Sequence, residues 1–382
     1  GKPLYHSATS RWRRIANGLR GKIKATGNTN VMHWQGKTYA LMEASRPLEI
    51  EATTLGTYGS SHLGGVVGMA FSAHPHRVVS KRTTFNFGLE FGFDVGWPPR
   101  VTSKLALYAL PDEGRGRKLG EVELPWVTMV HDFAVSEQHM VFVICPAKLN
   151  VLKVLSGHPD MGEYFDWDEA SHAELLVVPI NDPSRALRLP LPARWVFHLS
   201  NAFERDGQLL IDWVQYPDFE VFAALGSQGS IADIRAARLQ RLVLDLGSGK
   251  LRSDEVLWNH SSDFPVLPPG RVGHAYTTCW YTHFGDAETG GGVSRVDVES
   301  GAVDSWTPGR GYSPSEAVFV PRPGAQADDD GWLLPLVYDG WARKSFFAVL
   351  DAARPSAGPL AKLWYDQPLP VTFHGTFIPA TS

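Results

Sequence analysis

Short apolar runs alternate with turn residues along most of this chain, and long stripes with the 3.6-residue period of a helix are rare. The runs are rich in Val, Leu, Phe and Trp, which is typical of β-strands bounded by turns. One unit recurs, consisting of an apolar strand, an Asp/Ser/Gly turn and a second strand. Its copies are Leu48–Gly56, Leu176–Leu189, Arg241–Arg252, Ser294–Trp306, Phe346–Trp364 and, more loosely, Leu107–Val122.

The spacing of these turns predicts the fold class. Their centres lie near Ala52, Asp112, Asp182, Gly247, Glu299 and Ala353, so the successive gaps are 60, 70, 65, 52 and 54 residues. A four-stranded propeller blade with one long loop needs about that length. A pair of β-sandwiches is the alternative, because the unit by itself is only a hairpin signal. Six even hairpins without a linker favour one all-β propeller domain over residues 1–382, with a seventh blade closed by the first strands.

The segment before the first repeat fits this scheme poorly. Leu4–Lys24 lacks the pattern of a β-strand and is basic around Arg11–Arg14, so we expect a partly ordered N-terminal region. We expect no signal peptide at the start of the sequence and, without a run of 18 apolar residues, no transmembrane helix.

Composition narrows the function classes. The 382 residues are 43% apolar, enough for a large core, and the net charge of −4 with scattered basic residues argues against nucleic acid as a partner. The two cysteines, Cys145 and Cys279, cannot form a disulfide framework. They favour a reducing, cytoplasmic location and an inert buried role for both thiols.

Four of the 14 histidines stand beside short apolar runs, far apart in sequence. They are His74 (FSAHPH), His131 (VHDFA), His198 (WVFHLSNAFE) and His374 (FHGTF). A metal on a propeller axis requires this pattern, because each blade can offer one imidazole from its inner strand. Four neutral imidazoles suit iron(II), copper, nickel or zinc. Scattered core histidines remain the alternative on spacing alone.

Carboxylates in apolar contexts are candidate partners for the outward ring N–H groups of such ligands, since a buried carboxylate is unfavourable unless it is paired. Three stand out: Glu43 in LMEA, Asp263 in SDFP and Glu316 in PSEAVFV.

These segments together resemble the carotenoid cleavage oxygenase family, which includes apocarotenoid oxygenases, lignostilbene dioxygenases and the retinal-pigment isomerohydrolase. The resemblance runs from about Gly27 to Phe377. It rests on GNTNV, LMEA, AHP, HDFA, FHLSNAFE, SEAVFVPR and FHGTF, which occur in the family's order and spacing. It implies a seven-bladed propeller with a loop and helix cap over the face that bears a non-haem iron(II).

The resemblance also implies residue roles. His74, His131, His198 and His374 would hold the iron, with Glu43 behind His131, Asp263 behind His198 and Glu316 behind His374. The family usually has glutamate at position 263, so we expect the shorter aspartate to make a long or water-bridged contact. A small residue near Thr29 shields one iron position in apocarotenoid oxygenases, although a plain strand threonine is an equal interpretation.

The implied reaction is dioxygenase cleavage of a conjugated C=C bond in a lipophilic polyene, a carotenoid or apocarotenoid, by O2. A stilbene or phenylpropanoid substrate is the alternative. The resembling lignostilbene enzymes have a phenol-binding lysine where this chain has Met42, so an apolar polyene fits better. Met42 and Phe197 are candidate substrate-tunnel residues, and core packing is their other interpretation. An isomerohydrolase and a propeller that binds a lipophilic ligand without chemistry are further alternatives.

Leu149–Leu155 (LNVLKVL) is a candidate for peripheral membrane contact. In the resembling enzymes an apolar loop and helix at this point dips into the membrane beside the tunnel mouth. A short amphipathic helix fits interfacial docking, and a cap packed over the propeller face fits equally well.

Overall fold

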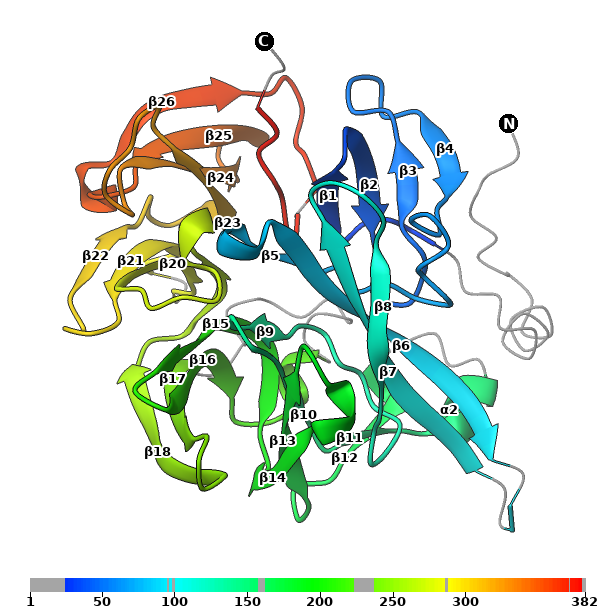
Figure 1. The fold of residues 1–382 in the computed structure, drawn as a ribbon. Helices are drawn as coiled ribbons and strands as arrows, with labels where there is room; N and C mark the ends of the chain where they lie inside the picture. The colour runs from blue at the N-terminus through cyan, green and yellow to red at the C-terminus, as the bar shows by residue number, and fades with distance from the viewer. Residues whose placement is uncertain are drawn as a thin grey trace.

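The computed structural model describes residues 25–94, 96, 97, 100–156, 162–222, 237–285, 288–370 and 372–379. Within these residues the chain forms six four-stranded antiparallel sheets, arranged around a central axis like the blades of a propeller (Figure 1). The strands of each sheet follow one another outward from the axis, so that strands such as β5, β9, β15 and β23 are innermost.

The first three sheets occupy the N-terminal half of the described chain. The first contains β1 (Asn30–Trp34), β2 (Lys37–Leu41), β3 (Leu48–Ile50) and β4 (Thr57–Ser60). The second contains β5 (His76–Val78), β6 (Thr83–Asp94), β7 (Arg100–Pro111) and β8 (Arg117–Glu123). The third contains β9 (Ala134–Val135), β10 (His139–Ile144), β13 (His172–Pro179) and β14 (Leu187–Pro192).

The other three sheets follow without a domain-sized insertion. The fourth contains β15 (Trp195–Arg205), β16 (Gln208–Tyr216), β17 (Arg238–Asp245) and β18 (Lys250–Trp258). The fifth contains β19 (Ser262–Val266), β20 (Thr278–His283), β21 (Gly292–Asp297) and β22 (Val303–Trp306). The sixth contains β23 (Tyr312–Pro321), β24 (Gly331–Asp339), β25 (Lys344–Asp351) and β26 (Pro359–Trp364).

Among the described residues, helices and 3-10 turns occur only in the connections between strands. An extra hairpin of β11 (Ala147–Leu149) and β12 (Phe165–Trp167) interrupts the third sheet and carries helix α2 (Val151–Ser156). Short 3-10 turns are η1 (Val79–Lys81), η2 (Gly162–Tyr164), η3 (Pro183–Arg185), η5 (Pro269–Arg271) and η6 (Pro355–Ala357). In the part of the chain that the structure describes, no helix has the length and apolar character needed to cross a membrane.

The sequence repeat corresponds to the blades. Each of the six turn centres inferred from the sequence joins the third and fourth strands of one sheet. The propeller prediction is therefore confirmed, but the seventh blade is wrong for the described residues. Each repeat completes one sheet, and apart from the β11–β12 hairpin no described strand is left over. Residues 1–24, which include the segment Leu4–Lys24 that was expected to be only partly ordered, lie outside the described residues.

Buried apolar clusters bind neighbouring sheets to each other. One joins the first and second sheets, one the second and third, one the third, fourth and fifth, and one the fifth and sixth. Among the described residues, no such cluster joins the sixth sheet to the first. The C-terminal segment 372–379 lies there instead, beside β1 (Figure 1).

Candidate metal centre

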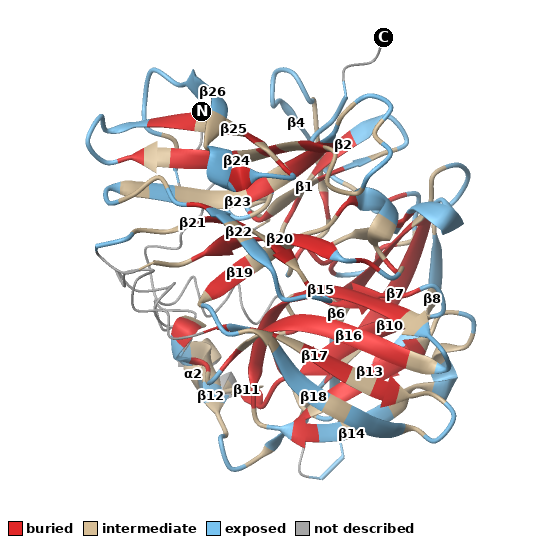
Figure 2. Ribbon diagram, turned by 90° about the vertical axis from the view of Figure 1, so that its left-hand side faces the viewer, coloured by how far each residue is buried: buried red, intermediate tan, exposed pale blue. Residues whose placement is uncertain are grey.

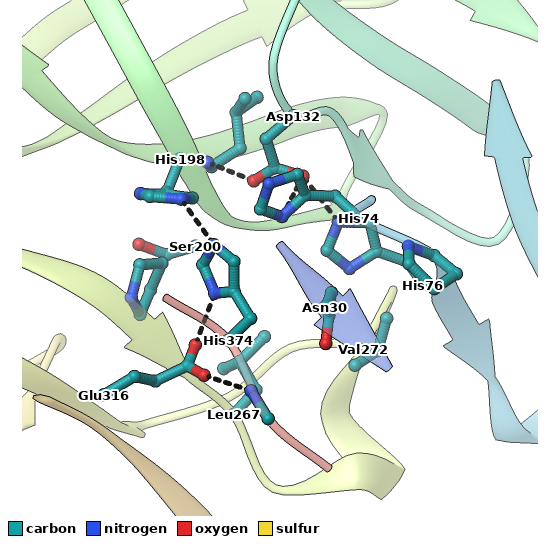
Figure 3. Close-up of a pocket in the computed structure, with 14 residues that line it drawn as sticks. Asn30, His74, His76, Asp132, His198, Ser200, Leu267, Val272, Glu316 and His374 are labelled. Carbon is teal, nitrogen blue, oxygen red and sulfur yellow. Dashed lines mark hydrogen bonds and ion pairs between the residues drawn. The ribbon is translucent and has the colours of Figure 1, made fainter. Parts of the chain in front are cut away.

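The structure brings His74, His131, His198 and His374 together on the propeller axis. One ring nitrogen from each lies within 4.8 Å of the other three. The Nε2 atoms of His74 and His131 are 3.0 Å apart, and those of His198 and His374 are 3.2 Å apart. Figure 3 shows His74, His198 and His374 pointing toward one another across the same space.

His74 is positioned by the chain just before β5. The Ser72 hydroxyl accepts a hydrogen bond from the His74 amide at 3.1 Å, and the Ser72 amide donates to the Phe87 carbonyl at 2.7 Å. This close approach needs Gly88, because a Cβ there would lie 1.9 Å from the Ala70 carbonyl oxygen. A glycine in β6 therefore lets the ligand-bearing segment lie directly against the second sheet.

The other three histidines reach the axis in different ways. His131 precedes β9, whereas His198 lies within β15, whose pairing with β16 shifts register on both sides of Leu199. Such bulges redirect side chains. His374 lies outside the strands, on the segment 372–379, where its amide donates to the Thr29 carbonyl at 3.1 Å.

A carboxylate stands behind three of the four rings. Glu43 Oε1 lies 3.1 Å from His131 Nδ1, Asp263 Oδ1 lies 2.8 Å from His198 Nδ1, and Glu316 Oε1 lies 2.9 Å from His374 Nδ1. These are the pairs expected from the resemblance. Glu43 and His131 differ from the other two pairs, because their geometry does not meet the criteria for a hydrogen bond. The expected long or water-bridged contact of Asp263 is wrong, since this bond is direct and the shortest of the three.

The second oxygen of each carboxylate also has a donor. The Thr29 hydroxyl lies 3.4 Å from Glu43 Oε2, and the Gly375 amide donates to Glu316 Oε2 at 3.0 Å. The Tyr216 hydroxyl donates to Asp263 Oδ2. Thr29 is therefore a partner of Glu43. Within the described residues, Glu43 is the only side chain that contacts the Thr29 hydroxyl.

Burial and the neighbouring carboxylates shift the pKa of the rings in opposite directions. Burial lowers the pKa of His74 well below its usual range, and the neighbouring imidazoles lower it further. Burial also lowers the pKa of His131, against the opposing effect of Glu43. Burial is the largest single influence on His198 and lowers its pKa, but the charge and hydrogen bond of Asp263, together with the charges of Asp132 and Glu316, raise the pKa of that ring overall.

This donor set fits a metal ion. An imidazole that donates from Nδ1 to a carboxylate keeps a lone pair on Nε2. Several such lone pairs pointing at one another across about 3 Å repel unless a proton or a cation lies between them. No carboxylate oxygen is part of the cluster, so the four ligand atoms are all imidazole nitrogens. Such sites are occupied by borderline divalent metals.

The sequence patterns did not single out Asp132, which follows His131 directly. It is 5% exposed; its Oδ2 accepts from the Leu199 amide at 2.9 Å and its Oδ1 lies 2.9 Å from His76 Nε2. The distance from Oδ1 to His74 Nδ1 is 3.8 Å. The apolar setting of VHDFA was the available signal, because the same criterion selected Glu43.

Aromatic rings surround the imidazoles on the side of the fourth and fifth sheets. The ring centroid of Phe197 lies 5.4 Å from that of His131, and Phe264 lies 5.2 Å from His198 and 5.4 Å from His374. Phe197 also contacts Trp195, Tyr216 and Phe222 and is 5% exposed, so it packs in the core as well as beside the centre. Phe264 and Tyr216 carried no signal in the sequence.

A cavity of about 170 Å³ opens beside the imidazoles. It is lined by His74, His198 and His374 and by polar side chains that include His76, Asp132 and Glu316 (Figure 3). Neither Met42 nor Phe197, the two expected tunnel residues, lines it. Met42 is half-buried, and its sulfur accepts a hydrogen bond from the Thr26 hydroxyl at 3.0 Å.

A β-propeller with four imidazoles gathered on its axis defines the class of protein. Residues 1–379 match the retinal pigment epithelial membrane protein family, and the chain belongs to that family. It is 30% identical to the apocarotenoid-15,15'-oxygenase of Synechocystis over 368 residues, which cover 93% of this chain and 73% of that protein. It is 28% identical to lignostilbene-α,β-dioxygenase isozyme III of Sphingomonas paucimobilis, over 95% of this chain and 76% of that protein.

Solved structures agree with this assignment. A cobalt-substituted Synechocystis apocarotenoid oxygenase superposes with a TM-score of 0.80 at 27% identity, covering 92% of this chain and 74% of that one. A chimera of apocarotenoid oxygenase and the retinal pigment protein gives a TM-score of 0.82 at 25% identity, covering 94% and 75%. The two relatives are an apocarotenoid oxygenase and a lignostilbene dioxygenase, and this similarity supports an oxygenase enzyme.

Proposed function

We propose that this protein is an iron(II)-dependent dioxygenase that cleaves a conjugated C=C bond of a carotenoid or apocarotenoid into two carbonyl products. The observation that carries the proposal is the convergence of four imidazole nitrogens within 4.8 Å, without a carboxylate ligand. Such a set leaves the dipositive charge of the ion uncompensated by its direct ligands and leaves coordination positions for O2. When bound, iron(II) supplies O2 activation beside the electron-rich olefin.

The protein's own residues have positioning roles in this proposal. His74, His131, His198 and His374 hold the ion, and Glu43, Asp263 and Glu316 fix three of the rings through their Nδ1 atoms. The cleavage needs no side chain that takes or gives a proton, which agrees with the pairing of all three carboxylates to ligand rings.

The apolar surroundings favour a polyene substrate. Phe197 stands beside His131 and continues into a cluster with Trp195, Phe219 and Phe222. An extended apolar chain that reached these aromatic faces would be stabilised by burial of its surface. Product analysis by mass spectrometry, with an apocarotenal panel, iron(II) and labelled O2, tests the proposal. Two carbonyl fragments from at least one apocarotenal support it, and intact substrates throughout the panel contradict it.

A stilbene-cleaving oxygenase is the second candidate, because relatives include the lignostilbene dioxygenase and a resveratrol cleavage oxygenase of Aspergillus fumigatus. Met42 argues against it. A buried phenol without a polar partner is unfavourable by about 1–3 kcal/mol, so we expect little turnover of 4-hydroxystilbenes. Met42→Lys should weaken apocarotenal turnover, because it places a charge on a half-buried side chain directly next to Glu43. Efficient resveratrol cleavage by the unchanged protein, with no apocarotenoid activity, would reverse the order of the two candidates.

Peripheral membrane contact through Leu149–Leu155 is part of the same proposal, in a cytoplasmic protein whose two cysteines stay reduced. Leu152 on α2 supports it, because that side chain is 78% exposed. Flotation with anionic vesicles compares the protein with Leu152→Glu and with the matched surface change Leu251→Glu. Loss of vesicle binding only in Leu152→Glu supports the contact, and equal binding by all three proteins contradicts it.

A further inference from the structure

Asp263 makes the shortest ring contact of the three carboxylates although it has the shortest side chain. It belongs to β19 of the fifth sheet, whereas His198 and Tyr216 belong to β15 and β16 of the fourth. The carboxylate thus crosses between two blades, with Oδ1 on His198 Nδ1 at 2.8 Å and Oδ2 on the Tyr216 hydroxyl. Something other than side-chain length must bring it close enough.

The backbone next to Asp263 supplies that approach. The pairing of β19 with β20 is interrupted between Asp263 and Val266, and Phe264 has a φ of +56°. This left-handed conformation is unfavourable for a bulky residue and persists only where its surroundings enforce it. It turns the Phe264 amide onto Asp263 Oδ1 at 2.8 Å, and the Phe264 ring lies against His198 and His374.

Asp263 is enclosed, and both of its oxygens have partners. The residue is 2% exposed, and its two oxygens are taken by the His198 ring, the Phe264 amide and the Tyr216 hydroxyl. Tyr216 is also 2% exposed, so it cannot swing into solvent to admit a longer side chain. The side chains of Glu43 and Glu316 are 26% and 13% exposed and have no comparable enclosure.

We propose that Tyr216 and Phe264 are positioning residues that adapt the metal centre of this chain to an aspartate. The left-handed conformation of Phe264 brings the short Asp263 carboxylate closer to the ring. The Tyr216 hydroxyl holds Asp263 Oδ2, so that Oδ1 stays on His198 Nδ1. A glutamate at position 263 therefore disrupts the centre instead of strengthening it. This inference rests on the metal-binding part of the proposed function and is independent of the substrate.

Cobalt(II) binding to the metal-free protein tests the role of Tyr216, with affinity read from the visible absorption of the bound ion. Tyr216→Phe and Asp263→Glu should each lower cobalt affinity about 10–100-fold, the usual range for partners of ligand residues. The double variant should bind better than Asp263→Glu alone, because the lost hydroxyl leaves space for the added methylene. If the two substitutions caused only independent structural defects, their losses of cobalt affinity would add in the double variant.

The matched control is Tyr281→Phe, because Tyr281 is 1% exposed and its hydroxyl pairs with Ser200 and not with a carboxylate. We expect unchanged cobalt affinity. Wild-type affinity in Tyr216→Phe, or tighter binding in Asp263→Glu, overturns the inference. If the unchanged protein binds cobalt with these variant effects but cleaves no polyene, the proposed function fails and the positioning role stands. If it binds no cobalt at all, both fail.

Two substitutions at Phe264 test the backbone. Glycine adopts a positive φ readily and alanine does not, so metal-free Phe264→Gly should melt at a higher temperature than Phe264→Ala. Cobalt affinity should follow the same order, because only the glycine variant keeps the amide on Asp263 at no conformational penalty. A higher melting temperature and tighter binding in Phe264→Ala would contradict the role of the left-handed conformation.

Discussion

His198 and His374 are placed for the same role on opposite sides of the axis, but the protein holds them very differently. His198 lies in β15, where every residue from Trp195 to Phe203 is buried, between sheets joined by the largest apolar cluster. His374 lies on a segment without strand structure, and its neighbours Phe373 and Phe377 are 41% and 49% exposed. Figure 2 shows the contrast between the buried strands of the fourth sheet and the exposed C-terminal end.

The difference shows that two identical side chains of one candidate centre can be positioned by different forces. His198 is placed by core packing, which exists with or without a metal. His374 is placed by three polar contacts. Its ring and the Gly375 amide both contact the Glu316 carboxylate, and its own amide donates to the Thr29 carbonyl. One side of the centre is therefore preformed, and the other depends on a few hydrogen bonds and on the ion itself.

The largest expected effect comes from removing each ligand in turn. His198→Ala and His374→Ala should both abolish stable metal binding and turnover. Only His198→Ala should also destabilise the metal-free protein, by about 3 kcal/mol, since it leaves Asp263 buried without its ring partner. Chemical unfolding of the two metal-free variants measures the difference. Equal losses of stability would remove the contrast between the two sides.

Glu316→Gln should lower metal affinity about 10–100-fold while leaving the fold intact, because the amide keeps a contact with Gly375 but attracts the His374 ring less strongly. Glu49→Gln, at a surface ion pair with Lys37, is the control and should bind metal normally. Equilibrium dialysis with iron(II) under anaerobic conditions gives both affinities. A Glu316→Gln protein with full metal content would show that packing alone places His374.

Hydrogen exchange should separate the two sides without mutation. We expect amides of β15 to exchange slowly in the metal-free protein and those of 372–379 to exchange quickly, because exposed segments with few contacts open locally. Adding metal should slow the second group far more than the first. Mass spectrometry of peptic fragments reports both regions, and slow exchange of 372–379 without metal would contradict the comparison.

The smallest effect concerns the thiols on the packed side. Cys145 and Cys279 are buried free cysteines in the largest cluster, and burial raises the pKa of each to about 12. The thiolate is the reactive form, so both should resist a thiol reagent at pH 8 in the native protein and react after unfolding. Rapid labelling of either residue in the native state would show that this side opens readily.

The sequence predicted those features that repeat along the chain or that place a polar residue in an apolar context. Turn residues at even spacing predicted the position of every blade, and the four histidines and three carboxylates were visible in their apolar contexts. The predicted number of blades was wrong because a hairpin pattern locates a sheet along the chain but does not show how the circle of blades closes. Tyr216 and Phe264 were invisible because their roles depend on a cross-blade contact and a positive φ, which no local pattern records.

The distance along the chain between ligands has a consequence for the denatured state. His74 and His374 are 300 residues apart in sequence, yet one ion would bind both. A bound ion therefore closes a loop that contains most of the protein, and the free energy of closing a loop rises with the logarithm of its length. In the proposed function, such an ion would be a reversible crosslink between the N-terminal and C-terminal parts of the propeller, where no apolar cluster of described residues joins the first and sixth sheets. A chelator should thus loosen the ring at that junction first.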